Sequence, residues 1–360
     1  MEKNFKKLDL SNTKAFIKAL VLFLGINFFL VSCSNEYVDF HSQKKEYKES
    51  LKKVYENSPK KDVSEIEELS VEISNLPDKS ALDKLIWELR NSKKRILLET
   101  YILTEKRIIN ELISAKKRGV SVKVILEKNV LWSPSINKKA LELLNKSWID
   151  AIYADSENYR FTHSKFFIID DLYIIGTWNM SHSTFYKNKE FFVYGKDYDN
   201  LKILERVFDD DWIWKKSIVC EENIITSPFC SRIMTQNILS LAEKSVYMYE
   251  QQIFDSSTEE IIMKKASEWV KINIILENPK NVKSNENIIK KFKLDNINTY
   301  FLEKTYIHAK AIIVDESIIY IWSINMTSNS MDNNREVGLV FRNENKSKEL
   351  IKQFNIEIGQ

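Results

Sequence analysis

The sequence repeats itself after a shift of about 150 residues, and this repeat limits the possible folds more than any other feature. Residues 96–99 match residues 247–250, and residues 122–127 match residues 272–277. In both copies the second match follows a predicted helix that carries a pair of adjacent lysines. A fixed period of this kind indicates a duplicated structural unit. We therefore expect a tandem duplication whose join lies between residues 214 and 228.

Within each copy, apolar runs alternate with amphipathic segments, which is typical of an α/β fold. The first copy is expected to begin with two helix–strand units, with helices at 81–91 and 106–118 and strands at 95–103 and 120–127. The predicted domains are residues 80–222 and residues 223–360.

The N-terminus resembles an export signal. A lysine-bearing stretch leads into residues 19–31, which are almost wholly apolar and too few to span a bilayer comfortably. The run ends in Leu30-Val31-Ser32-Cys33, which resembles the lipobox of bacterial lipoproteins, where the cysteine is lipidated. We expect residues 1–32 to be a signal peptide and Cys33 to carry the lipid of an exported, membrane-anchored protein on the periplasmic or cell-surface side. An uncleaved N-terminal anchor is the alternative.

The body that would remain after cleavage has no formal net charge. The whole chain has 54 basic and 51 acidic side chains, and the signal segment holds five and two of these, which leaves 49 of each. Bulk charge therefore gives no support for a nucleic-acid-binding protein. Residues 33–79 lack a sustained apolar stripe and are rich in polar residues, so we expect a tether with some helix there.

The chain has three cysteines, of which two remain if Cys33 is lipidated. In an oxidising compartment, Cys220 and Cys230 can form a disulfide that closes a short loop. Two unpaired thiols are the alternative, because spacing does not show that the two Cβ atoms face each other.

Each copy carries five polar residue types in the same order and at nearly the same spacing. They are His163, Lys165, Asp170, Asn179 and Glu190 in the first copy, and His308, Lys310, Asp315, Asn325 and Glu336 in the second. Each set begins in a predicted β-hairpin, where residues two apart share a face and residues seven apart do not. Each histidine should therefore point the same way as its lysine, whereas the aspartates should have a structural role near the turn.

His-x-Lys, followed after four residues by Asp and present twice, resembles the HKD motif of the phospholipase D superfamily. Residues 176–179 and 322–325 are similar to the Gly-Ser-x-Asn that follows it in this family. The resemblance covers residues 80–360 and implies two similar α/β domains, each a mixed sheet flanked by helices, packed around one pseudo-twofold site. It implies a metal-independent phosphodiesterase without a cofactor, for which a monomer suffices because both motifs lie in one chain.

The resemblance also implies roles for the site residues. His163 would attack phosphorus and form a phosphohistidine, and His308 would protonate the leaving alcohol and then activate water, with the reverse assignment as the alternative. Lysines, amides and hydroxyls would hold the phosphoryl oxygens, namely Lys165, Lys310, Asn179, Asn325, Thr177 and Ser323. Glu190 and Glu336 would each accept a hydrogen bond from the far ring nitrogen of a histidine. Trp322 stands where the family has glycine, and its indole could narrow the pocket.

Three functions are compatible with the sequence. The favoured one is a phospholipase D-type enzyme that hydrolyses or transfers phospholipid, because the predicted anchor would hold the site at a membrane. An endonuclease of the same superfamily, cutting DNA or RNA, is the first alternative. A non-enzymatic surface protein with a relic site, suggested by Trp322, is the second.

Overall fold

The computed structural model describes residues 66–221, 223–294 and 297–359, and the fold is reported for these residues. The predicted signal segment at 1–32, the predicted lipidation site Cys33 and residues 34–65 of the predicted tether lie outside the described residues. Within the described ranges, no helix combines the length and the apolar character needed to cross a membrane.

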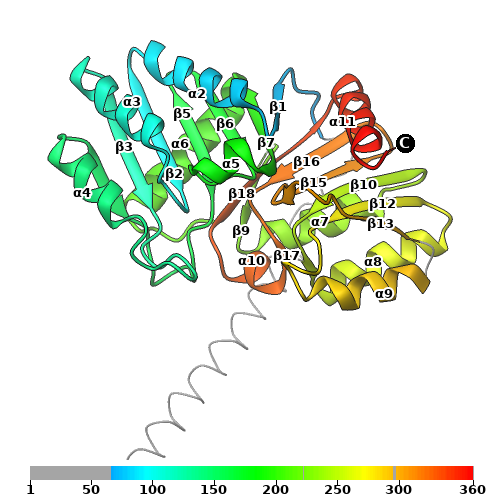
Figure 1. Cartoon of the computed structure of the whole chain (residues 1–360). Helices are drawn as coiled ribbons and strands as arrows, with labels where there is room; N and C mark the ends of the chain where they lie inside the picture. The colour runs from blue at the N-terminus through cyan, green and yellow to red at the C-terminus, as the bar shows by residue number, and fades with distance from the viewer. Residues whose placement is uncertain (1–65, 222, 295–296, 360) are drawn as a thin grey trace, which may run out of the picture. The chain divides into compact units, whose positions relative to one another are not determined.

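The first half of the described chain forms a mixed sheet with the strand order β1-β7-β6-β5-β2-β3-β4 (Figure 1). Its strands are β1 (Glu72–Leu76), β2 (Arg95–Thr100), β3 (Ser121–Leu126), β4 (Asp150–Tyr153), β5 (Lys165–Ile169), β6 (Leu172–Gly176) and β7 (Asn188–Gly195). Its helices are α2 (Lys79–Asn91), α3 (Lys106–Lys117), α4 (Lys138–Lys146), α5 (His182–Tyr186) and α6 (Tyr198–Trp212). Strands β2, β3 and β4 are parallel, whereas β5, β6, β7 and β1 pair antiparallel.

The second half repeats this topology in the order β13-β12-β10-β15-β16-β18-β9-β8. Its strands in that sheet are β8 (Cys220–Glu221), β9 (Ile224–Ser227), β10 (Ser245–Glu250), β12 (Lys271–Leu276), β13 (Asn298–Tyr300), β15 (Ala311–Val314), β16 (Ile318–Trp322) and β18 (Glu336–Arg342). Two short strands, β11 (Ile253–Phe254) and β17 (Met326–Thr327), pair with each other, and β14 (Tyr306–Ile307) pairs with β7 of the first half. The helices are α7 (Cys230–Ser240), α8 (Ser256–Ser267), α9 (Asn285–Leu294), α10 (Ser328–Asp332) and α11 (Glu344–Glu357). The predicted α/β fold with two similar domains is confirmed.

The alternation of side chains along the strands explains how the two sheets are buried. Phe166 and Ile168 of β5 belong to one apolar core together with residues of the second sheet such as Ile313. Phe167 and Ile169 point to the other face and pack in a second core under the helices of the first half. Both faces of the central strands are therefore covered, as expected for strands that read as continuous apolar runs.

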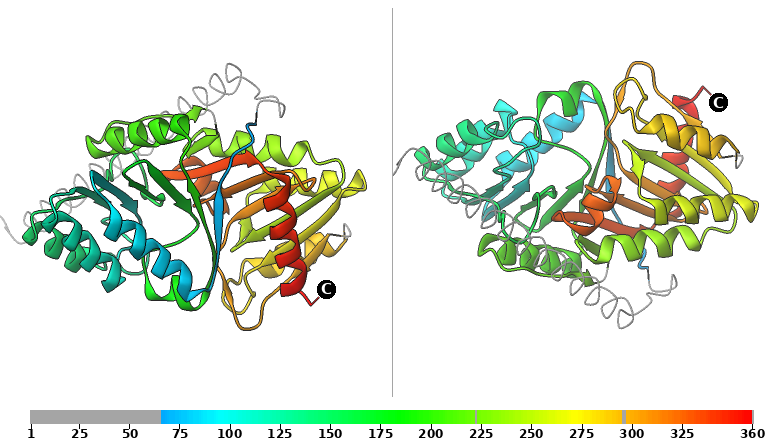
Figure 2. Two further views of the ribbon diagram at one scale, coloured as in Figure 1. Left: turned by 90° about the horizontal axis from the view of Figure 1, so that it is seen from above. Right: turned by 90° about the horizontal axis from the view of Figure 1, so that it is seen from below.

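The predicted tether needs a correction, because part of it belongs to the folded body. β1 pairs with β7 over five residues, and the preceding residues also reach the second half, where Leu69 donates its backbone N–H to the carbonyl of Arg342 (3.2 Å). The blue strand β1 lies at the junction of the two halves in both views of Figure 2. An edge strand buries little of itself, so its sequence carries no strong apolar signal.

The predicted boundary at 222/223 also falls inside a structural unit. β8 and β9 form an antiparallel hairpin of the second sheet, and β9 occupies the place that β1 has in the first sheet. Cys220 in β8 and Cys230 at the start of α7 form a disulfide across this hairpin. The second structural repeat therefore begins before residue 222.

Candidate active site

The histidines and lysines of both motifs lie at the same edge of their sheets. Thr100, the last residue of β2, pairs with Lys165 at the start of β5. In the second half, Tyr249 near the end of β10 pairs with Ala311, directly after Lys310. The two histidines retain a little exposure, whereas both lysines are fully buried.

Each histidine is held by a glutamate from the opposite half. His163 donates from Nδ1 to Oε2 of Glu336 (2.8 Å), and His308 donates from Nδ1 to Oε1 of Glu190 (2.8 Å). Both glutamates are fully buried. Because each carboxylate keeps the proton on Nδ1, each Nε2 is left with its lone pair in the neutral ring. The crossed pairs bring the two motifs together in one site.

The hydroxyls of Thr177 and Ser323 support the glutamates. Thr177 donates to Oε2 of Glu190 (2.5 Å), and Ser323 donates to Oε2 of Glu336 (2.7 Å). Both residues have no exposed surface, and each hydroxyl oxygen also accepts a backbone N–H. This corrects the expected phosphate-binding role: a hydroxyl committed to a buried carboxylate cannot also face a substrate. Thr177 and Ser323 position Glu190 and Glu336.

The two motif asparagines have free acceptor atoms. The buried Oδ1 atoms of Asn179 and Asn325 have no hydrogen-bond partner among the described residues. A buried polar atom without a partner is uncommon because desolvation costs roughly 1–3 kcal/mol. Each free Oδ1 can accept a hydrogen bond from a ligand, and the Nδ2 group of the same amide is the donor that can meet a phosphoryl oxygen.

The buried lysines supply cationic groups whose charge depends on their surroundings. Lys165 donates from Nζ to the carbonyl of His163 (2.5 Å), and Lys310 donates in the same way to the carbonyl of His308. Burial lowers the pKa of Lys165 to about 7, with Glu336 opposing the decrease and Lys310 adding to it. Burial likewise lowers the pKa of Lys310, although Glu190 opposes it. An anionic phosphate between the two ammonium groups would favour their charged forms.

Burial favours the neutral form of both histidines. Burial lowers the pKa of His163 to about 4, with Glu336 opposing the shift and Lys165 adding to it. Burial also lowers the pKa of His308, where Glu190 opposes the shift and Lys310 adds to it. A neutral imidazole with its Nδ1 proton held by a carboxylate has a free Nε2 lone pair, which is the form a nucleophile needs.

The motif aspartates lie at the other end of the hairpins, as strand parity suggested. The carboxylate of Asp170 accepts backbone N–H groups of Lys93, Lys94 and Arg95 (2.7 to 3.0 Å). The carboxylate of Asp315 accepts the three corresponding groups of residues 243–245, each at 2.8 Å. They fix the turn before β2 and the turn before β10, and so set the register of the strands that end at the site.

Trp322 lies across from Lys310 on the neighbouring strand and donates its backbone N–H to that residue's carbonyl (3.3 Å). Its side chain is fully buried and packs edge-to-face on Tyr320, with ring centroids 3.9 Å apart. At the equivalent place in the first half, a side chain at Gly176 would overlap the indole of Trp178. The two halves thus each fill this part of the core with an indole, from Trp178 in one and from Trp322 in the other.

Two buried cations beside the site glutamates were missed by the sequence reasoning. Arg335 pairs with Asp211 of α6 (2.7 Å), and Lys189 pairs with Glu357 of α11. Each cation directly precedes a site glutamate and each pair again joins opposite halves. The signal was available, because a basic residue stands before the glutamate in both copies of the repeat.

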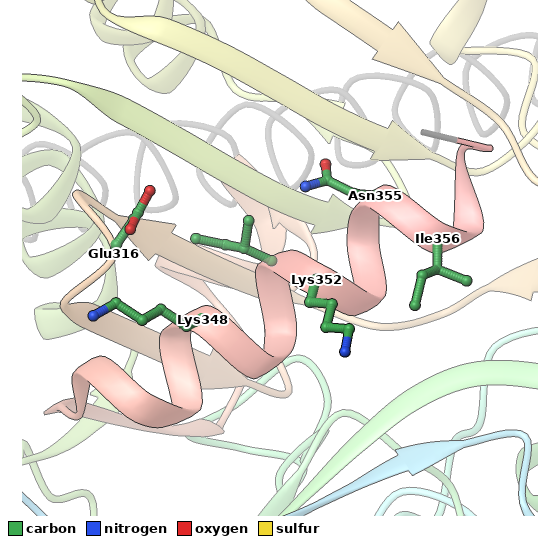
Figure 3. A pocket seen from close by; sticks show the side chains of 6 residues that line it. Glu316, Lys348, Lys352, Asn355 and Ile356 are labelled. Atoms are coloured by element: carbon green, nitrogen blue, oxygen red, sulfur yellow. The ribbon is translucent and has the colours of Figure 1, made fainter.

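Two surface cavities differ in their relation to this site. A cavity of about 850 Å³ is lined by residues of both halves, among them Lys187 beside β7 and Tyr306, two residues before His308. A second cavity of about 440 Å³ lies against α11 and is lined by Lys348, Lys352 and Glu316 (Figure 3). Glu316 belongs to the β15–β16 turn, at the sheet edge opposite Lys310, so the second cavity is remote from the chemistry.

The arrangement can catalyse substitution at phosphorus. It combines two imidazoles with oriented tautomers, two ammonium groups and two amides around one position, on a duplicated α/β fold. Such a set supplies a nucleophile, a proton carrier and charge stabilisation for an anionic phosphoryl group. The fold and site define a class of two-motif enzymes that act on phosphodiesters.

The chain belongs to the phospholipase D superfamily. The family model described as "Cardiolipin synthase, PLD-like domain" matches residues 85–212 and residues 235–357, one match in each half. The chain is similar to a cardiolipin synthase from Clostridium perfringens (strain SM101 / Type A), with 25% identity over 325 residues, which cover 76% of this chain and 67% of that protein.

Solved structures support the fold. A phosphatidylserine synthase from Haemophilus influenzae Rd KW20 matches with a TM-score of 0.61 and 12% identity, over 80% of this chain and 86% of that one. A polyphosphate kinase from Porphyromonas gingivalis matches with a TM-score of 0.62 and 14% identity, over 79% of this chain. The match spans 46% of the kinase, less than half of its length. At these identities the likeness concerns the fold alone.

Proposed function

We propose that this protein cleaves or transfers phospholipid phosphodiesters through a phosphohistidine on His163. The observation that carries the proposal is the pair of crossed His–Glu hydrogen bonds, which ties the imidazole of each motif to the opposite half, two residues from a buried lysine. The family description and the cardiolipin synthase relative favour a lipid over a nucleic acid. The formally neutral body gives no added support for nucleic acid.

The proposed reaction has two steps. Nε2 of His163 attacks phosphorus, the bond from phosphorus to the leaving alcohol breaks, and Nε2 of protonated His308 gives its proton to the alcohol oxygen. Neutral His308 then takes a proton from water or from a second alcohol, whose oxygen attacks phosphorus and displaces His163. Water gives hydrolysis and an alcohol gives transfer. Lys165, Lys310, Asn179 and Asn325 stabilise the phosphoryl group in both steps.

Binding of the substrate would favour the protonated form of His308 that the first step needs. The lowered pKa of His308 disfavours its protonated form in the free protein. A bound phosphate monoanion would raise that pKa by opposite charge, so that the acid forms only when the substrate is in place. Protonation of the site is thereby coupled to occupancy.

The experiment that tests the proposal is a substrate panel given to the full chain in parallel. Phosphatidylcholine, cardiolipin, single-stranded DNA and duplex DNA are incubated with the protein, with and without EDTA. We expect a lipid to be cut, with no loss on chelation. Cleavage of DNA alone would show the endonuclease alternative, and no cleavage of any substrate would favour the relic-site alternative.

Variants of the two histidines test the shared site. His163→Ala and His308→Ala should each lower turnover by about a hundredfold or more, because each removes one essential role. Phosphorus label trapped on the His308→Ala protein should map to His163, and label on His308 in the reciprocal variant would reverse the assignment. Half of the activity remaining in each variant would contradict a single site.

We also propose that the protein is an exported lipoprotein anchored through Cys33, and that it acts as a monomer. The lipobox-like ending at residue 33 supports the anchor, and the presence of both motifs in one chain supports the monomer. Mass spectrometry of the native protein should find a lipid-bearing N-terminus at Cys33. An intact Met1 would contradict cleavage.

A further inference from the structure

Exposed apolar side chains gather on two loops of the first half. Leu131 and Trp132 follow β3 and are 53% and 92% exposed, and Ile213 and Trp214 follow α6 and are 68% and 48% exposed. Single exposed apolar residues are ordinary on soluble proteins, whereas adjacent large ones on neighbouring loops mark contact surfaces. We call these four residues the apolar rim.

The rim lies at the sheet edge that holds the active site. The loop with Leu131 follows the C-terminal end of β3, which runs parallel to β2, and β2 ends beside Lys165. Leu131 donates its backbone N–H to the hydroxyl of Tyr101 (2.6 Å), and the Tyr101 ring lies edge-on to His163 with centroids 4.6 Å apart. The side chain of Tyr101 therefore connects the first rim loop to His163, the proposed nucleophile.

The second rim loop is tied to the segment that leads into His163. The carbonyl of Trp214 accepts a hydrogen bond from the side chain of Asn158 (3.2 Å). Asn158 lies between the C-terminal end of β4 and the histidine, in the same loop as Tyr159, whose hydroxyl accepts the backbone N–H of Ser217 (3.3 Å). Both rim loops therefore border the chain around His163.

The backbone of the rim tryptophans is unusual for their side chains. Trp132 has φ 67° and Trp214 has φ 56°, in the left-handed region that favours glycine and is rare for bulky residues. This conformation costs stability, and the indole of Trp132, which is 92% exposed, gains little packing inside the protein in return. The same conformation recurs at the exposed Trp148 and Trp269, so Trp132 and Trp214 are distinguished by their place beside His163 and not by their backbone.

The charges near the first rim loop in the sequence favour an anionic partner. Exposed lysines flank Leu131 and Trp132 on both sides, namely Lys128, Lys138 and Lys139. Tryptophan prefers the boundary between lipid headgroups and acyl chains, and lysines beside it attract anionic headgroups. The corresponding loop after β12 is polar, with Asn278, Lys280 and Asn281 lining the 850 Å³ cavity. In the second half, Phe254 follows β10 and is 67% exposed, so a single apolar side chain stands there in place of the adjacent pairs of the rim.

We propose that the apolar rim inserts into the surface of a bilayer that contains anionic phospholipid and so sets the active site against the lipid headgroups. This inference deepens the proposed function by assigning the surface that meets the substrate layer. The insertion is shallow, of the kind made by residues at an interface, and it is independent of the anchor predicted at Cys33.

The chain contains a matched control for the rim. Trp269 has φ 68° and is 94% exposed, nearly the same as Trp132, but it precedes β12 and so lies at the opposite sheet edge. Trp148 has φ 62° and precedes β4 in the same way. A strand of six residues separates the two edges by about 20 Å, which is far beyond the depth of an interfacial contact.

Quenching of tryptophan emission by brominated lipid tests the insertion directly. The full chain is placed on vesicles of phosphatidylglycerol and phosphatidylcholine brominated in the acyl chains. All eight tryptophans lie between Trp87 and Trp322, so the N-terminal anchor contributes no signal. We expect partial quenching that is largely lost in a Trp132→Phe, Trp214→Phe double variant and kept in a Trp148→Phe, Trp269→Phe double variant. An unquenched wild type, or the reverse pattern between the variants, would overturn the proposal.

A turnover measurement separates this inference from the proposed function. Trp132→Gly, which suits the left-handed backbone, should lower turnover of phospholipid in vesicles by roughly tenfold. It should leave turnover of a soluble, monomeric phosphodiester within about twofold, and Trp269→Gly should affect neither. Equal loss on both substrates would refute a membrane role for Trp132. If brominated lipid quenches the rim tryptophans but the protein cuts no phospholipid, membrane insertion of the rim would be supported and the proposed function would be contradicted.

Discussion

At the scale of single residues, each histidine is hydrogen-bonded to the glutamate of the opposite half, and this predicts which reaction step each glutamate variant should slow. Glu336→Gln should reduce covalent labelling of His163 by about ten- to a hundredfold, because it removes the carboxylate that fixes this ring. Glu190→Gln should slow release of the phosphoryl group at least as strongly as labelling, because His308 is the acid in the first step and the base in the second. Trapping with labelled substrate measures both.

Thermal denaturation of both glutamine variants serves as the control, since the amides are close in volume to the carboxylates they replace. If Glu336→Gln acted on His308 instead, each glutamate would serve its own half and the crossed arrangement would be refuted.

The lowered pKa values predict an acidic optimum. Lys165, with a pKa of about 7, loses its charge as pH rises through neutrality, so kcat/KM should fall there. His163, with a pKa of about 4, gains a proton and loses its nucleophilic lone pair as pH falls further, so kcat/KM should decline again. Because kcat/KM reports groups of the free enzyme, its maximum should lie between these two values. An optimum well above neutrality would contradict the lowered pKa of Lys165.

The residues that meet at the candidate site could be predicted from the repeat, whereas the hydrogen-bond partner of each could not. Spacing identified the histidines, lysines and glutamates, but spacing alone does not say which histidine a glutamate meets across the halves. Thr177 is an example of the same limit: a hydroxyl near the site can face the substrate or a buried carboxylate, and only packing decides. Trp322 likewise departs from the motif in sequence while an indole fills the equivalent space in the other half.

At the scale of secondary structure elements, β1 is the one that the sequence reasoning placed outside the fold. Its pairing with β7 and the burial of Leu69, Val71 and Leu76 show that residues 66–76 stabilise the body. A chain that begins at residue 79 should lose about 1.5–3 kcal/mol for each of these buried side chains relative to one that begins at residue 66. Urea denaturation of the two proteins measures the difference.

Equal midpoints for the two proteins would show that β1 is dispensable.

Helices with a clear periodic pattern could be predicted from the sequence. Helix α3 was expected at 106–118 and spans Lys106–Lys117, because its buried residues recur with the helical period. β1 has only five residues and a single fully buried one, which is too little for a pattern.

At the scale of the whole molecule, buried ion pairs hold the halves together. Arg335 is fully buried and meets Asp211 from the other half. Asp211→Asn should lower the free energy of unfolding by about 3–5 kcal/mol, because it leaves the guanidinium charge without its carboxylate. Glu349→Gln, which breaks the exposed pair with Lys346, is the control and should cost less than about 1 kcal/mol. Calorimetry that finds equal effects would show that the buried pair contributes no more than the surface pair.

The crossed glutamates also have a consequence for ancestry. A gene that encoded only one half would make a protein whose histidine has no carboxylate behind it, because that carboxylate comes from the other half. Such a protein would reach a complete site only by pairing two copies head to head, each lending its glutamate to the other. In a chain that contains both copies, each half depends on the other for the glutamate behind its histidine. A substitution of the glutamate in one half would therefore impair the histidine of the other half.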